Sequence, residues 1–327
     1  MTTATTQACA NIALIKYWGN RDDTLRLAAN SSLSMNLGGL ETRTSIAFDL
    51  SLAADELTLN GRPGPVEALR RMSGFLDLVR GMAGSQLRAR VSSENNFPTG
   101  AGIASSASAY AALALAASTA LGLDLSERDL SRLARRGSGS ACRSIPGGFV
   151  EWQAGETDAD SYAFSIAPPD YWDLVDVIAV VEAGEKATGS SAGHSLAATS
   201  ILQPARVADA PRRVVLCRQA IVEKDFEKLA EVVELDCNLM HAVMITSTPL
   251  LIYWEPGTLE LICQVQSWRA AGLPVCYTID AGPNVHILTL GDSAAVVEEL
   301  VRNVPAVRTV YVAPPGGPAR LVNDGHF

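Results

Sequence analysis

The segment that most constrains this chain runs from Pro98 to Ala107 and reads Pro-Thr-Gly-Ala-Gly-Ile-Ala-Ser-Ser-Ala. Gly100 and Gly102 let the backbone turn tightly and approach a ligand closely, because neither residue has a Cβ atom. An alanine-rich stretch, which favours a helix, follows at once. The first amides of a helix have no partners within it and carry the positive end of its dipole, and Ser105 and Ser106 add hydroxyl donors there. The segment therefore predicts a loop and helix N-terminus that bind an anion, most simply a phosphate.

Other interpretations of this segment remain open from its residues alone. Gly-Ala-Gly before an alanine-rich helix is also compatible with close packing of the backbone and nothing more. The segment lacks the Gly-Lys-Ser/Thr of the Walker loop. It also lacks an acidic residue about twenty positions on in a second strand, which the dinucleotide fingerprint requires. A phosphate function must therefore be argued from the rest of the chain.

The composition is that of a globular protein without a preference for nucleic acid or membranes. Of the 327 residues, 48% are hydrophobic and 19% are charged, and the formal net charge of −9 provides no field that attracts polyanions. Six cysteines without a CxxC pair and four dispersed histidines indicate neither a zinc site nor a disulfide framework. No signal-peptide pattern or long apolar run is seen, so we expect a cytoplasmic protein.

The order of the expected elements favours an α+β fold. Strand-like alternation covers 31–37 and 42–48, helical spacing covers 66–79, and Ser126 is a typical N-cap for a helix over 127–136. From 176 onward the order is strand, helices, strand, strand, helix, strand, which is that of a ferredoxin-like half. We expect its elements at 176–181, 211–241, 259–271, 275–280, 285–289, 292–303 and 309–312.

A change of composition marks the boundary between two expected domains. The stretch 155–171 is acidic and contains two consecutive prolines. We therefore place an N-terminal domain at 1–172 and a C-terminal domain at 173–327. Any active cleft would lie between them.

Four loops rich in small polar residues carry side chains that folding alone does not require. They are Lys16–Arg21, Ser138–Arg143, Ser190 with Ser191, and Asp280 beside Gly282. Each has an ordinary structural interpretation, with Lys16 as a surface cation, Arg143 as a helix cap and Asp280 as a turn former. The serines could be plain loop hydroxyls, and we expect the histidines to be structural or surface residues.

Together, these segments resemble one family. They include Ala10–Asp22, with Lys-Tyr-Trp-Gly-Asn-Arg-Asp at its end, then Asn30–Ser34, Ser93–Ala107, Gly137–Ser144 and Asp280–Asn284. In order and spacing they are similar to the mevalonate diphosphate decarboxylase family, within the superfamily of galactokinase, homoserine kinase, mevalonate kinase and phosphomevalonate kinase (GHMP). The resemblance spans nearly the whole chain. It implies a GHMP-kinase-like fold, with an ATP-binding N-terminal domain and a ferredoxin-like C-terminal domain.

The resemblance also implies a reaction. ATP would phosphorylate the C3 hydroxyl of a phosphorylated mevalonate, and loss of phosphate and carbon dioxide would then give an isoprenoid C5 unit. Asp280 would orient that hydroxyl and take its proton, and Arg143 would hold the C1 carboxylate. Lys16 would add a cation near the phosphoryl group or the substrate.

The resemblance extends to binding residues and to assembly. The implied substrate-binding residues are Tyr17, Trp18, Asn20, Arg70, Ser138, Ser140, Arg143, Ser190 and Ser191. The implied ATP-binding residues are Pro98, Gly100, Ala101, Gly102, Ala104, Ser105 and Ser106. We expect Mg²⁺ to bind together with ATP, with Ser105 as a candidate ligand and without direct coordination by a carboxylate. A homodimer is implied as well.

One departure from the family pattern bears on the substrate. The family has a second lysine where this chain has Asn20, at the place where the substrate's diphosphate is bound. Loss of a cation suits a substrate with less charge, so we favour mevalonate 5-phosphate, which would give isopentenyl phosphate. The alternative is mevalonate 5-diphosphate, with an arginine such as Arg70 or Arg71 in compensation. A small-molecule kinase without decarboxylation and a non-catalytic nucleotide-binding protein are further alternatives.

Overall fold

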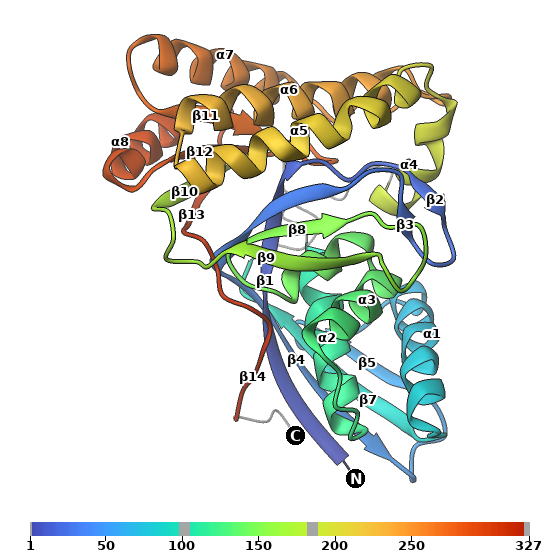
Figure 1. Cartoon of the computed structure of the whole chain (residues 1–327). Coiled ribbons are helices and arrows are strands. Elements are labelled where there is room, and N and C mark those ends of the chain that lie inside the picture. The colour runs from blue at the N-terminus through green and yellow to red at the C-terminus, as the bar shows by residue number, and fades with distance from the viewer. Residues whose placement is uncertain (1, 98–104, 182–188, 324–327) are drawn as a thin grey trace.

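The computed structural model describes residues 2–97, 105–181 and 189–323. Two sheets organise the fold, and the first is built around two long strands (Figure 1). β1 (Thr2–Ile15) pairs antiparallel with β4 (Ser32–Asp49) at the centre of the first sheet. The sequence predicted two strands within β4, but they form one. Gly39 has a φ of +82°, and the register with β1 steps across residues 38–40 without ending the strand.

The other strands of the first sheet are arranged on either side of β4, whose two halves pair with different neighbours. β7 (Arg88–Asn95) pairs with one half and β8 (Phe149–Gln153) with the other. The outer strands are β5 (Glu56–Leu59), β6 (Arg62–Pro63), β9 (Tyr162–Ala167) and β14 (Arg320–Leu321). A short hairpin of β2 (Asn20–Asp22) and β3 (Leu27–Ala28) stands apart.

Three helices, each predicted from the sequence, cover one face of this sheet (Figure 1). They are α1 (Val66–Ala83), α2 (Ser105–Ala120) and α3 (Glu127–Gly137). The buried alanines of α2 let it lie close to β1, where the Thr6 hydroxyl donates to the Ala112 carbonyl at 2.7 Å. The N-cap prediction is confirmed, because Ser126 accepts a hydrogen bond from the Asp129 amide. The loop expected next is instead a 3₁₀ helix, η1 (Gly139–Ser144).

The second sheet has the ferredoxin-like order that the sequence predicted. Its four antiparallel strands lie in the order β11 (Val275–Thr278), β12 (Val285–Leu290), β10 (Leu174–Val180) and β13 (Thr309–Ala313). The helices of this half are α4 (Ser190–Leu196), η2 (Ala197–Thr199), α5 (Gln203–Glu223), α6 (Phe226–Ile245), α7 (Pro256–Ala270) and α8 (Gly291–Arg302). Among the described residues, no helix is long and apolar enough to cross a membrane.

The single helical stretch expected at 211–241 is two helices. Lys224 adopts the left-handed conformation with a φ of 56° and ends α5. The Asp225 carboxylate then accepts the Lys228 amide at 3.1 Å and begins α6. No glycine or proline marks this break, so the propensity of the residues did not reveal it.

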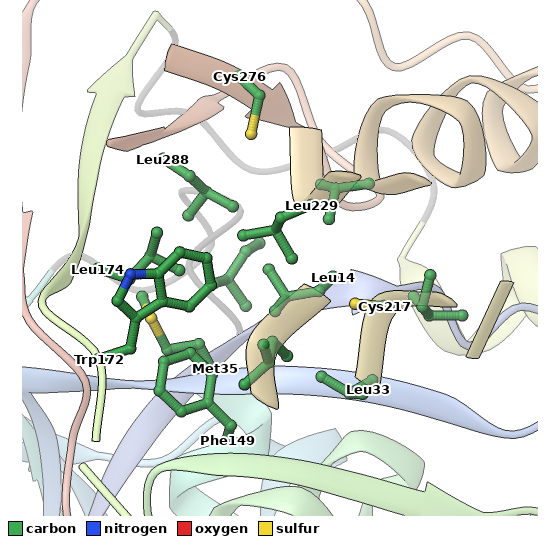
Figure 2. Close-up of a cluster of buried hydrophobic side chains, with 14 of the residues drawn as sticks. Leu14, Leu33, Met35, Phe149, Trp172, Leu174, Cys217, Leu229, Cys276 and Leu288 are labelled. Carbon is green, nitrogen blue, oxygen red and sulfur yellow. The ribbon is translucent and has the colours of Figure 1, made fainter. Parts of the chain in front are cut away.

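A hydrophobic cluster joins the two halves. Figure 2 shows it between Leu14, Leu33 and Met35 of the first sheet and side chains of the second half, including Cys217, Leu229, Cys276 and Leu288. The C-terminal segment also returns to the first sheet, where β14 pairs with β1 and the Gly38 amide donates to the Pro314 carbonyl. The expected boundary at 172/173 assigns these last residues to the C-terminal domain, but they contact the first sheet.

Candidate active site

An ion pair between the two halves forms the centre of the site. Lys16 directly follows β1, and Asp280 comes two residues after β11. The buried Lys16 ammonium donates to Asp280 Oδ1 at 2.5 Å. The Asp280 side chain keeps 26% of its surface exposed, so the carboxylate is accessible. Burial raises its pKa, but the charge and hydrogen bond of Lys16 outweigh this and hold the pKa below its ordinary value. Asp280 is therefore ionised at neutral pH.

Arg143 belongs to the same site. It lies in η1, is almost fully buried, and donates to the Ser32 hydroxyl at 2.7 Å and to Asn11 Oδ1 at 3.2 Å. Its Nε atom is buried and has no hydrogen-bond partner among the residues that the structure describes. Burial lowers the pKa of Arg143, and the charge of Asp280 opposes this shift. The structure thus brings together the aspartate and the arginine that the sequence predicted to act on one molecule.

Tyr17, Trp18 and an unexpected histidine form an aromatic cluster beside Lys16. The His194 ring, from α4, stacks on Tyr17 with ring centroids 4.1 Å apart and lies 4.6 Å from Trp18. Its Nδ1 accepts the Gly19 amide at 3.0 Å, so the proton of the neutral ring is on Nε2. Burial, with the charges of Arg26 and others, lowers the pKa of His194 to about 3. The imidazole therefore stays neutral.

The Asn20 amide is used in local contacts. Its oxygen accepts the Tyr17 hydroxyl, and its nitrogen donates to Asp23 at 2.8 Å. The next residue, Arg21, points outward and pairs with the exposed Glu156 at 3.0 Å. Position 20 thus supplies no cation, and Arg21 does not replace one.

The predicted serines are described only in part. The hydroxyls of Ser106, at the start of α2, and Ser138 are 3.3 Å apart, which joins the helix N-terminus to η1. The Ser140 carbonyl accepts from Asn11, the residue that holds Arg143. Ser190 and Ser191 begin α4, but their side chains lie outside the described residues, as do Pro98, Gly100, Ala101, Gly102 and Ala104.

A pocket opens beside the N-terminus of α2. It encloses about 790 Å³, open mouth included, and its lining includes Ser105, Ser106, Tyr110, Arg71, Leu57, Met72 and Leu113. Arg71 lies over the Tyr110 ring, 5.7 Å from its centroid. By contrast, Arg70 is exposed and pairs with Glu67 at 2.7 Å. The structure therefore does not bring Arg70 to the ion pair, and its neighbour lines the pocket instead.

Family models match both halves of the chain. The diphosphomevalonate decarboxylase-like N-terminal domain matches residues 8–163, and the mevalonate 5-diphosphate decarboxylase C-terminal domain matches residues 176–312. The chain is 40% identical over 325 residues to the diphosphomevalonate decarboxylase of Aspergillus fumigatus, across 92% of this chain and 80% of that relative.

Solved structures agree over the whole length. The chain is similar to MDDEF in complex with MVAPP, AMPPCP and magnesium, with a TM-score of 0.93, 38% identity and 99% of each chain covered. It is also similar to the mevalonate diphosphate decarboxylase from Enterococcus faecalis, with a TM-score of 0.91, 36% identity and 99% of each chain covered. These matches confirm the resemblance and the two-domain α+β fold. The chain belongs to the diphosphomevalonate decarboxylase family.

Proposed function

We propose that this protein decarboxylates mevalonate 5-diphosphate with ATP. The observation that carries the proposal is the ionised Asp280, paired with Lys16 and close enough to Arg143 for the two charges to affect each other. These are an acid–base group and a carboxylate-binding group in one site. The relatives named diphosphomevalonate decarboxylase supply the independent support.

Each group has one task in this reaction. The Arg143 guanidinium holds the C1 carboxylate through a charge-assisted contact. The Asp280 carboxylate orients the C3 hydroxyl and accepts its proton as that oxygen receives the phosphoryl group. When phosphate leaves C3, the electrons of the C1–C2 bond form the C2=C3 double bond, and C1 departs as carbon dioxide.

The pocket beside α2 fits a nucleotide. Leu57, Met72 and Leu113 give it apolar walls suited to a purine ring. The first amides of α2, with Ser105 and Ser106, suit the phosphates. Bound ATP with Mg²⁺ supplies the phosphoryl group that turns the C3 oxygen into a leaving group. Among the described residues, no cluster of three or more His, Cys, Asp or Glu could hold a metal. Ser105 and the phosphates are our candidate Mg²⁺ ligands.

The relatives favour the diphosphate over the monophosphate that the sequence led us to prefer. A neutral Asn20 then requires another cation for the terminal phosphate. Our candidate is Arg26, in the turn between β2 and β3, whose Nε donates to the Arg136 carbonyl at 3.1 Å. After burial, its charge is the strongest influence on the pKa of both Tyr17 and His194. Arg26 therefore acts on the groups around Asn20.

A coupled assay tests the proposal. With ATP, Mg²⁺ and mevalonate 5-diphosphate, the purified protein should release carbon dioxide and ADP in equal amounts. The kcat/KM for mevalonate 5-phosphate should be lower by a factor of about ten or more. A factor of ten corresponds to about 1.4 kcal/mol of lost phosphate binding. Release of ADP without carbon dioxide would identify a kinase. A preference for the monophosphate would restore the first substrate hypothesis.

The cytoplasmic location and the homodimer are part of this proposal. Both come from the sequence and its resemblance to the family. Light scattering on the purified protein measures the mass in solution, and a mass of one chain would contradict the dimer.

A further inference from the structure

Lys16 is held at its main chain as well as at its ammonium group. Its amide donates to Asp236 Oδ2 at 2.6 Å, and its carbonyl accepts from the Arg206 guanidinium at 2.8 Å. Asp236 lies in α6 and Arg206 in α5, whereas Lys16 follows β1. The second half of the chain therefore holds this residue on both sides.

These two side chains have almost no exposed surface with which to bind a ligand. Both are buried, Asp236 fully and Arg206 to within 2%. The other oxygen of Asp236 accepts from Arg213 Nε at 2.7 Å, so the carboxylate charge is paired. Arg206 also donates to the Trp18 carbonyl at 3.3 Å and to Asn30 Oδ1 at 3.2 Å. Burying charges is costly unless they are paired and bonded. Here three of the bonds are directed at the main chain of Lys16 and Trp18.

We propose that Arg206 and Asp236 are positioning residues that act through Lys16. By fixing its main chain, they hold its ammonium against Asp280, and they touch no reacting atom themselves. A displacement of about 1 Å in a catalytic group can cost about 100-fold in rate. The inference rests on the proposed function, which gives Asp280 its task, but it can be tested without turnover.

The test uses the effect of Lys16 on Asp280. Burial alone raises the pKa of Asp280, and the charge and hydrogen bond of Lys16 are the main influences that lower it. His286 of β12 and Arg143 of η1 add to this lowering. Arg206 is not among these largest influences, so we expect its removal to change the pKa of Asp280 mainly by moving Lys16.

The variant Arg206→Met keeps the apolar stem and removes the donors. In a carboxyl ¹³C NMR titration, with Asp280→Asn for assignment, the pKa of Asp280 should rise by about one unit. The kcat should fall about 100-fold, with a smaller change in KM. Arg206→Lys should recover part of both effects, because one ammonium reaches only some of the acceptors of a guanidinium.

Arg218→Met is the matched control. Arg218 is also on α5 and pairs across the two halves with Glu151 of β8 at 2.6 Å, without a contact to Lys16. This variant should leave the pKa of Asp280 at the wild-type value. An unchanged Asp280 in folded Arg206→Met would overturn the proposal, even if activity fell.

A milder variant covers the case in which Arg206→Met does not fold. Asn30→Ala removes a 3.0 Å hydrogen bond to the Lys16 carbonyl and one acceptor of Arg206. It should raise the pKa of Asp280 by a smaller amount, and no shift in this variant would contradict the proposal. Because the titration needs no substrate, its outcome is independent of whether the proposed reaction takes place.

Discussion

The residue at position 20 determines whether another cation is needed to bind the substrate's terminal phosphate. Its neutral amide bonds to Tyr17 and Asp23, and Arg26 is the nearby cation that we propose for the terminal phosphate. Of the two compensating residues that the sequence suggested, Arg70 is exposed and paired with Glu67, and Arg71 lines the pocket beside α2. The difference between one and two phosphates should therefore depend on Arg26.

Arg26→Met should lower kcat/KM for the diphosphate about tenfold and for the monophosphate less, because the second phosphate carries the added charge. Asn20→Lys in the same chain should restore much of the loss. Steady-state kinetics with both substrates measure this. Arg21→Met is the control, because its guanidinium bonds to Glu156 and to main-chain carbonyls. An equal loss for both substrates would contradict the role of Arg26.

The sequence pointed to the side chains that we propose as catalytic, but not to all of their neighbours. Lys16, Arg143 and Asp280 stand in motifs that could be recognised locally. His194 was expected to be a structural or surface residue, because no carboxylate or cysteine stands at a metal-ligand spacing from it in the sequence. Its partner, the Gly19 amide, is 175 positions away, and only the fold brings the two together.

At the scale of elements, the junction of α5 and α6 depends on one capping side chain. Asp225→Ala should lower the free energy of unfolding by about 1 kcal/mol, because the Lys228 amide loses its acceptor. Urea denaturation measures the change. Asp225→Asn keeps an N-cap acceptor and should lose less. Equal losses for the two variants would show that the charge, and not the cap, stabilises the junction.

The elements were predictable where local signals determine them. The ferredoxin-like order followed from alternation and a hairpin signal, and the start of α3 followed from Ser126. The break at Lys224 and the 3₁₀ turn of η1 were not predicted. Lysine is a good helix former, and the residues of η1 bond to Asn11 and Ser32, which are distant in the sequence.

In the whole molecule, the site depends on how closely the two halves are joined. The cluster in Figure 2 contains side chains from both sheets and from α5 and α6. The ion pair of Arg218 with Glu151 crosses the same interface, and β14 brings the end of the chain back to β1. The composition places a boundary near 172, but it contains no signal for the pairing of β14 with β1.

The proposed function requires the carboxylate of Asp280 to act in a site that both halves of the chain build. The most direct measurement is release of labelled carbon dioxide from carboxyl-labelled mevalonate 5-diphosphate by the wild type and by Asp280→Asn, with nucleotide binding measured in parallel. We predict that the variant binds the ATP analogue as the wild type does but releases carbon dioxide about 100-fold to 10,000-fold more slowly, as for loss of an acid–base group. Release at the wild-type rate by Asp280→Asn would contradict the account.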